Sequence, residues 1–104
     1  MSTWTDMGAA DNIEQEDVVG VEIGGREYAI YRSLDDVYYA TDGLCTHQQV
    51  RLCDGLVMGR IIECPKHNGR FDYTTGEGRG VPIRENLRTY PAKVVDGRVL
   101  VDLG

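Results

Sequence analysis

The sequence predicts an all-β protein built from antiparallel sheets, arranged as a sandwich or a barrel. Short segments with alternating apolar and polar residues recur along the chain. Turns rich in glycine and aspartate separate them, and two of these turns, Gly24-Gly25 and Asp96-Gly97, are typical of tight hairpins. No stretch shows a convincing helical period, which also favours strands over helices.

The expected elements follow from these alternations in chain order. Pro91 has no N–H to donate, so its strand is expected at a sheet edge or broken at that residue. The segment Gly76–Pro82 is rich in glycine and is expected to be an irregular loop, and only Asp11–Asp17 is a candidate for a helical turn. The expected strands are Val18–Ile23, Tyr28–Arg32, Val37–Thr41, Leu56–Met58, Arg60–Glu63, Arg70–Tyr73, Leu87–Val95 and Arg98–Val101.

Length and charge limit the classes of function. The 104 residues are expected to form one domain, 1–104. A formal net charge of −6 repels phosphate, so nucleic acid is not expected as a partner. No run approaches the roughly 20 apolar residues that span a bilayer, and the amino-terminal residues have neither a basic nor an apolar segment of a signal peptide. We therefore expect a cytoplasmic protein with no membrane partner.

Two short segments carry a distinctive set of metal ligands. Cys45 and His47 lie in one, Cys64 and His67 lie in the other, and these are the two histidines of the chain. Two thiolates and two imidazoles are the ligands of a [2Fe–2S] centre in which histidines replace cysteines on one iron. Zinc also accepts two cysteines and two histidines, but zinc sites usually pair like ligands within one loop. The mixed loops therefore favour the iron–sulfur cluster, with zinc as the alternative.

The sequence around these ligands resembles the Rieske family. The resemblance covers Cys64–Asp72, Thr75-Gly76-Glu77 and Gly80-Val81-Pro82, which is similar to the proline loop of that family. It implies the Rieske iron–sulfur fold, with a cluster-binding subdomain at about residues 43–76 inserted in a basal β domain. It also implies one [2Fe–2S] cluster held by four residues. These cofactor-binding and metal-binding residues are Cys45, His47, Cys64 and His67.

The chain length resembles that of stand-alone Rieske-type ferredoxins of bacterial aromatic-ring-hydroxylating dioxygenases. This resemblance implies a one-electron carrier, not an enzyme, between an NAD(P)H-dependent flavoprotein reductase and a terminal oxygenase. No histidine remains for the second iron that an oxygenase needs. The alternatives are a redox-sensing regulatory module and, with less support, a small subunit of a nitrite reductase. The expected contact ring at the cluster tip comprises Gln48, Gln49, Val50, Leu52, Lys66, Asn68 and Pro82.

The Rieske proteins of cytochrome bc complexes form the high-potential branch of the family, and this chain departs from them at four positions. Val50 and Lys66 stand where that branch has a disulfide, and Gly69 and Phe71 stand where it has hydroxyl donors. Each missing donor leaves the reduced cluster less stabilised, so we expect a reduction potential of about −150 mV. The third cysteine, Cys53, is expected to be a small buried or half-buried apolar residue rather than a reactive thiol.

Overall fold

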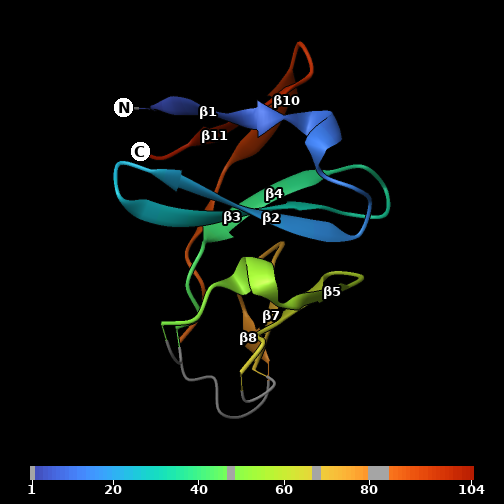
Figure 1. The fold of residues 1–104 in the computed structure, drawn as a ribbon, viewed down its shortest axis with the longest axis vertical. Helices are drawn as coiled ribbons and strands as arrows, with labels where there is room; N and C mark the ends of the chain where they lie inside the picture. The colour runs from blue at the N-terminus through green and yellow to red at the C-terminus, as the bar shows by residue number, and fades with distance from the viewer. Residues whose placement is uncertain (1, 47–48, 67–68, 80–84) are drawn as a thin grey trace.

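The computed structural model describes residues 2–46, 49–66, 69–79 and 85–104. Within these ranges the chain forms three antiparallel sheets and two short 3₁₀ turns, η1 (Ala10–Asn12) and η2 (Leu52–Asp54). Two sheets stack in the basal part of the molecule, and the third lies below them (Figure 1). The expected all-β class is confirmed, and no helix in the described ranges is long and apolar enough to cross a membrane.

The first sheet joins the two ends of the chain. Its order is β1 (Trp4–Ala9), β11 (Arg98–Asp102) and β10 (Ala92–Val95). Asp96 and Gly97 connect β10 to β11 with φ of 50° and 76°, which confirms the expected tight hairpin. The strand β1 was absent from the sequence-based expectations. It pairs with the other end of the chain, where Trp4 lies opposite Asp102.

The second sheet has the order β2 (Asp17–Ile23), β3 (Arg26–Arg32), β4 (Tyr38–Asp42) and β9 (Thr89–Tyr90). Gly24 and Gly25, with φ of 59° and 81°, make the turn between β2 and β3, as expected. Pro91 separates β9 from β10, and the chain passes there from the second sheet to the first. The expected break at Pro91 is confirmed.

The third sheet follows the order β5 (Leu56–Met58), β6 (Ile61–Glu63), β7 (Arg70–Asp72) and β8 (Gly78–Arg79). The strand β8 corrects the expectation that Gly76–Pro82 is irregular throughout, because Gly78 pairs with Phe71 and Arg79 with Arg70. Residues 80–82 of that segment lie outside the described residues.

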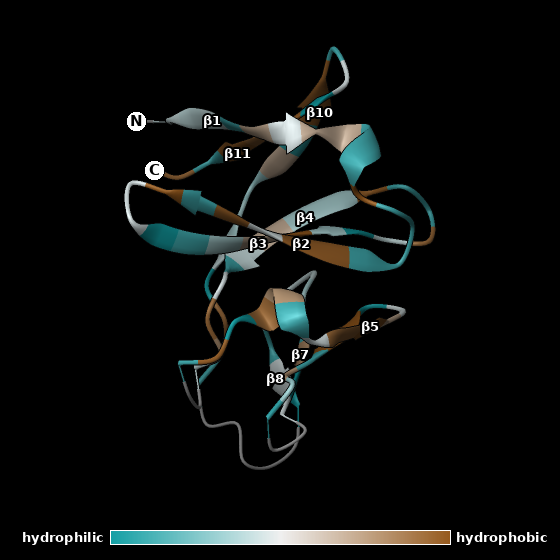
Figure 2. Cartoon of the chain, in the orientation of Figure 1, coloured by the Kyte–Doolittle hydropathy of each residue, from teal (hydrophilic) through white to brown (hydrophobic). Residues whose placement is uncertain are grey.

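The strand β3 lies between two apolar cores because its side chains alternate between the two faces of its sheet. Tyr28 and Ile30 enter the core between the first and second sheets. Ala29 and Tyr31 enter a second core, shared with the third sheet and with both Cys45 and Cys64. Figure 2 shows apolar stretches along β2 and β5. The third sheet is therefore packed against the second sheet through the same core that holds the two cysteines.

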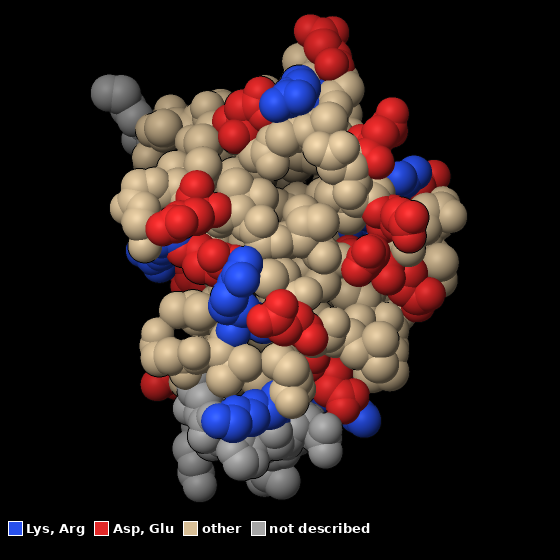
Figure 3. All heavy atoms as spheres, viewed as in Figure 1, with Lys and Arg blue, Asp and Glu red and all other residues tan. Residues whose placement is uncertain are grey.

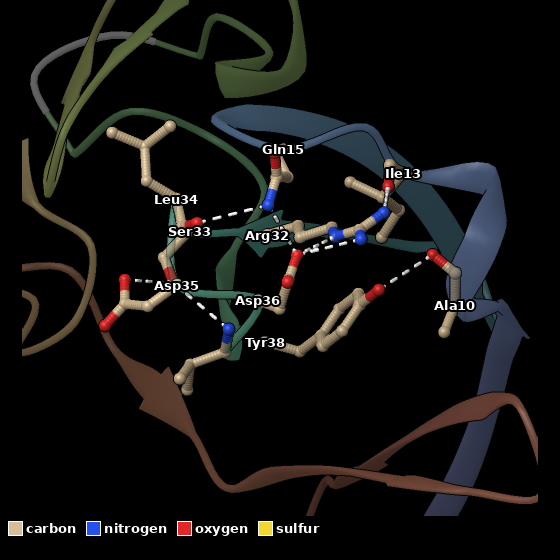
Figure 4. A network of polar contacts seen from close by, with 10 residues as sticks. Ala10, Ile13, Gln15, Arg32, Ser33, Leu34, Asp35, Asp36 and Tyr38 are labelled. Carbon is tan, nitrogen blue, oxygen red and sulfur yellow. Dashed lines mark hydrogen bonds and ion pairs between the residues drawn. The ribbon is translucent and has the colours of Figure 1, made fainter.

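Polar contacts connect the β3–β4 turn to the segment before β2 (Figure 4). Arg32 donates to the Ile13 carbonyl at 2.8 Å and to the Asp36 carboxylate at 2.9 Å. The Gln15 side-chain amide donates to the same carboxylate at 2.9 Å, and the Tyr38 hydroxyl donates to the Ala10 carbonyl at 3.1 Å. These contacts hold the segment that follows η1, which turns at Gln15 and Glu16 before β2 begins. The helical turn expected in Asp11–Asp17 is found as the 3₁₀ turn η1, which begins one residue earlier and ends at Asn12.

Candidate cluster site

The first cysteine lies at the base of a short loop. Cys45 is fully buried, and its N–H donates to the Val50 carbonyl at 2.9 Å. One residue further out on each side, Leu44 and Arg51 form an isolated antiparallel bridge. Backbone pairing therefore closes the loop between Leu44 and Arg51 and fixes the position of the Cys45 sulfur.

The second cysteine lies directly after β6. Cys64 is 2% exposed, and its N–H donates to the Gly69 carbonyl at 2.6 Å. The backbone N–H of Lys66, two residues further along the chain, lowers the pKa of the Cys64 thiol and so favours its thiolate. The turn at Pro65 and Lys66 therefore places a favourable backbone dipole near the sulfur.

The two thiols meet inside the apolar core. Burial raises the pKa of the Cys64 thiol, and the neighbouring Cys45 thiol raises it further. Two adjacent buried thiolates repel each other, so this arrangement is favourable only when a positive centre binds both. All three cysteines lie among the described residues, and none forms a disulfide. The two buried thiols therefore fit an iron that takes two cysteine ligands.

The other two expected ligands, His47 and His67, lie outside the described residues. Each belongs to a loop whose base is described, two or three residues after its cysteine. The assignment of His47 and His67 as ligands stays a prediction from the sequence.

The expected contact ring is described only in part. Gln49 and Lys66 are exposed, and Val50 is half-buried, whereas Gln48, Asn68 and Pro82 lie outside the described residues. The inclusion of Leu52 is wrong, because this side chain is fully buried in the core beside the cysteines. Leu52 is the first residue of η2, and this turn directs its side chain inward beneath the first loop.

Contacts from the segment before β9 also support the site, and no local sequence pattern predicts them. The Thr46 hydroxyl, between Cys45 and His47 in the chain, donates to the Glu85 carbonyl at 3.0 Å. The Leu87 N–H donates to the Gly76 carbonyl at 2.7 Å. A Cβ at Gly76 would lie 2.2 Å from the Leu87 carbonyl oxygen, and its φ of +84° also favours glycine.

Cys53 is half-buried and packs against the core beside the cysteines, as expected. Burial raises the pKa of its thiol, and the carboxylates of Asp54 and Glu27 raise it further, against the charge of Arg51. A raised pKa disfavours the reactive thiolate. The structure therefore agrees with an unreactive Cys53.

Formal charge is divided unevenly along the chain. Residues 43–87 contain six Lys or Arg and five Asp or Glu. The rest of the chain contains five Lys or Arg and twelve Asp or Glu. Acidic side chains accordingly gather over the basal sheets in the view of Figure 3. The part of the chain that holds the cysteines is therefore close to neutral.

Comparison with known proteins agrees with this geometry. Residues 3–91 match the Rieske [2Fe-2S] domain family. The ferredoxin component of the naphthalene 1,2-dioxygenase system of Pseudomonas aeruginosa is 46% identical over 100 residues, which cover 96% of this chain and 95% of that protein. The Sphingomonas yanoikuyae B1 ferredoxin superposes with a TM-score of 0.91 at 33% identity, over 98% of this chain and 100% of that one.

A third similar protein comes from the complex of reduced oxygenase and oxidized ferredoxin in carbazole 1,9a-dioxygenase. It has a TM-score of 0.87 at 32% identity, over 95% of this chain and 92% of that one. The chain therefore belongs to the Rieske [2Fe-2S] domain family. Within this family its similar relatives are ferredoxin components of dioxygenase systems. Its cofactor is accordingly one Rieske-type [2Fe–2S] cluster, and the chain is an electron-transfer component rather than a catalytic enzyme.

Proposed function

We propose that this chain is a soluble, cytoplasmic one-electron carrier. It takes electrons from an NAD(P)H-dependent flavoprotein reductase and delivers them to the terminal oxygenase of an aromatic-ring-hydroxylating dioxygenase. The observation that carries this proposal is the pair of adjacent buried thiols in a chain 46% identical to a dioxygenase ferredoxin component. The structural similarity to a ferredoxin from an oxygenase complex supports the oxygenase as a partner.

Four residues are proposed to hold the cluster: Cys45 and Cys64 bind one iron, and His47 and His67 bind the other. A Rieske cluster supplies a single reversible electron, which is carried mainly by the histidine-bound iron. The chain contributes a dry environment around the two sulfurs, and the backbone N–H of Lys66 favours the Cys64 thiolate. Hydrogen bonds to ligand sulfurs stabilise the reduced state and so help to set the potential.

We also propose that residues 1–104 form one domain with a cluster-binding subdomain at about 43–76. The arrangement of the third sheet supports this division, because β5, β6 and β7 pair with one another and not with the basal sheets. The partner of β7, β8, lies just beyond the proposed boundary at Gly78–Arg79.

Docking is proposed at the cluster tip, through a small transient interface. Lys66 and Gln49 are exposed beside the two cysteine loops. Among the described residues no carboxylate forms an ion pair with Lys66, so its charge is available to a partner. Interfaces of redox partners that must dock and leave are typically below about 1,200 Å².

Reconstitution tests the proposal. Wild-type protein added to a reductase and a terminal oxygenase of a naphthalene dioxygenase system is expected to restore NADH-driven oxidation of naphthalene. Lys66→Glu is expected to keep the cluster absorbance and slow this turnover. Lys93→Glu, which changes net charge equally on the exposed strand β10, is the matched control. Equal rates for the two variants would contradict docking at the tip, and failure of wild type to support turnover would contradict the carrier.

A further inference from the structure

We infer that Glu27 and Arg51 form a clamp that positions the first cluster loop on the basal sheet. This inference rests on the proposed ligand role of Cys45. Glu27 belongs to β3 of the second sheet, and Arg51 closes the loop that begins at Leu44. Both are positioning residues, because neither is proposed to touch the cluster.

The carboxylate of Glu27 receives two hydrogen bonds from one guanidinium group. The Nε and Nη2 atoms of Arg51 each donate to Glu27 Oε2 at 3.2 Å. Among the described residues this is the ion pair that joins the basal sheets to residues 43–79; the other pairs lie within one part or the other. A planar guanidinium fixes orientation as well as distance, which suits a positioning role.

Glu27 also holds the opposite end of the same loop. Its backbone carbonyl accepts the Gly43 N–H at 2.9 Å, and the Gly43 carbonyl in turn accepts the Leu52 N–H at 2.8 Å. Gly43 precedes Cys45 by two residues, and Leu52 directly follows Arg51. One residue of the basal sheet therefore holds both ends of the loop that carries Cys45.

Two glycines leave the space that the Glu27 side chain occupies. A Cβ at Gly20 would lie 2.3 Å from Glu27 Oε2, and a Cβ at Gly43 would lie 2.3 Å from Glu27 Cγ. A larger residue at either position would displace the side chain. The Cys53 sulfur lies 3.8 Å from the same carboxylate oxygen, as a weak third donor. Gly20, Gly43 and Cys53 thus form a cradle around the Glu27 side chain. This cradle explains why the side chain is only 17% exposed although it is charged.

The partial burial of Glu27 predicts an asymmetry between the two partners. Loss of the guanidinium leaves a largely buried carboxylate without its strong donor, whereas loss of the carboxylate leaves an arginine whose side chain is 55% exposed. Arg51→Gln should therefore disturb the loop more than Glu27→Gln. The glutamine of the latter variant has the same shape as glutamate and fits the same cradle.

The test measures how fast purified protein loses the visible absorbance of its cluster, together with the EPR spectrum of the reduced state. We expect about fivefold faster loss in Glu27→Gln, a larger effect in Arg51→Gln, and altered EPR line shapes in both. The double variant should be no worse than Arg51→Gln, because the pair acts as one unit. The control is Asp6→Asn, which breaks the Arg98–Asp6 pair of 3.1 Å within the first sheet and should change neither readout.

Two results would overturn the clamp. One is that Glu27→Gln and Arg51→Gln retain the cluster as well as Asp6→Asn, with unchanged EPR spectra. The other is that the variants shift the midpoint potential in opposite directions without faster cluster loss, since this pattern identifies a purely electrostatic effect. Absence of a cluster from wild-type protein would instead contradict the proposed function, so the two failures are distinguishable.

Discussion

Asp72 is the buried carboxylate that organises the turn after β7, and replacing it with asparagine should destabilise the protein. Its Oδ1 atom accepts hydrogen bonds from the Thr74 N–H at 2.9 Å and the Thr74 hydroxyl at 2.6 Å. Its Oδ2 atom lies 3.6 Å from Nη2 of Arg60 and 3.7 Å from Nη2 of Arg79. The Asp72 side chain is only 7% exposed, so these contacts are partly shielded from water.

The magnitude follows from these contacts. A hydrogen bond to a charged group contributes about 1.5–3 kcal/mol, and the amide oxygen of asparagine retains about half of that. The two guanidinium groups are 68% and 52% exposed, so their ion pairs add less than about 1 kcal/mol. Asp72→Asn should therefore lower the free energy of unfolding by about 2 kcal/mol, which lowers Tm by roughly 10 °C in a domain of this size.

The effect should also depend on pH. Burial by itself raises the pKa of Asp72, but hydrogen bonds from Thr74 and the charges of Arg60 and Arg79 outweigh it and lower the pKa below its ordinary value of 3.8. A carboxyl with a lowered pKa stabilises the folded state above pH 3.8, and this contribution is lost as pH falls below 3.8 through the folded-state pKa. The difference in stability between wild type and Asp72→Asn should therefore shrink in that range.

The assay is thermal unfolding followed by far-ultraviolet circular dichroism, at pH 7 and at steps down to pH 3. Glu77→Gln is the matched control, because it breaks the exposed 2.8 Å pair with Arg79 and should cost less than about 0.5 kcal/mol. The reasoning is refuted if Asp72→Asn unfolds at the same temperature as Glu77→Gln at pH 7, or if its deficit does not change on acidification.

Two further predictions concern the aromatic residues of the core beside the cysteines. Tyr73 stacks on Tyr31 with ring centroids 4.5 Å apart and donates its hydroxyl to the Gly59 carbonyl at 2.6 Å, and burial raises its pKa to about 12. Tyr73→Phe keeps the ring stacking but leaves the Gly59 carbonyl without its donor. Urea denaturation should therefore show that the free energy of unfolding falls by about 1–2 kcal/mol. An unchanged urea midpoint contradicts this prediction. Phe71 is fully buried and lacks the hydroxyl that the high-potential branch has at this position. Phe71→Tyr should therefore raise the midpoint potential from about −150 mV in a spectroelectrochemical titration. A lowered potential would count against the argument from missing hydrogen-bond donors.

Local sequence signals predicted the hairpins and turns well. Gly24-Gly25 and Asp96-Gly97 adopt positive φ, which glycine tolerates because it has no Cβ. Pro91 separates two sheets because it has no N–H to donate to a ladder. The strand Trp4–Ala9 was missed because its pairing partner, β11, lies at the far end of the chain. Such a strand depends on a distant partner and has no strong alternation of its own.

For the site, the motifs placed Cys45 and Cys64 at one metal centre, and the structure places both cysteines in one core. Ligation by these two residues and by His47 and His67 stays a prediction. The burial of Leu52 was not predictable from the loop sequence, because η2 turns its side chain away from the surface. The contacts around Glu27 depend on Gly20 and Gly43, two glycines from different segments of the chain, which no local pattern connects.

The uneven distribution of charge also refines the expected potential. A net charge of −6 by itself disfavours the reduced cluster, but residues 43–87 are close to neutral and the acidic excess lies in the remainder of the chain. The net charge of the whole chain is therefore a weak guide to the potential, and the expected low potential rests mainly on the missing hydroxyl groups at Gly69 and Phe71.

The most direct test of the central claim is the iron and acid-labile sulfide content of anaerobically purified protein, combined with EPR of the reduced state. Two buried thiolates and two imidazoles around one cluster predict about two irons and two sulfides per chain and an EPR signal with average g below 2. Cys64→Ser should lose both the metal and the signal. A colourless wild-type protein that contains stoichiometric zinc and no sulfide would contradict the account.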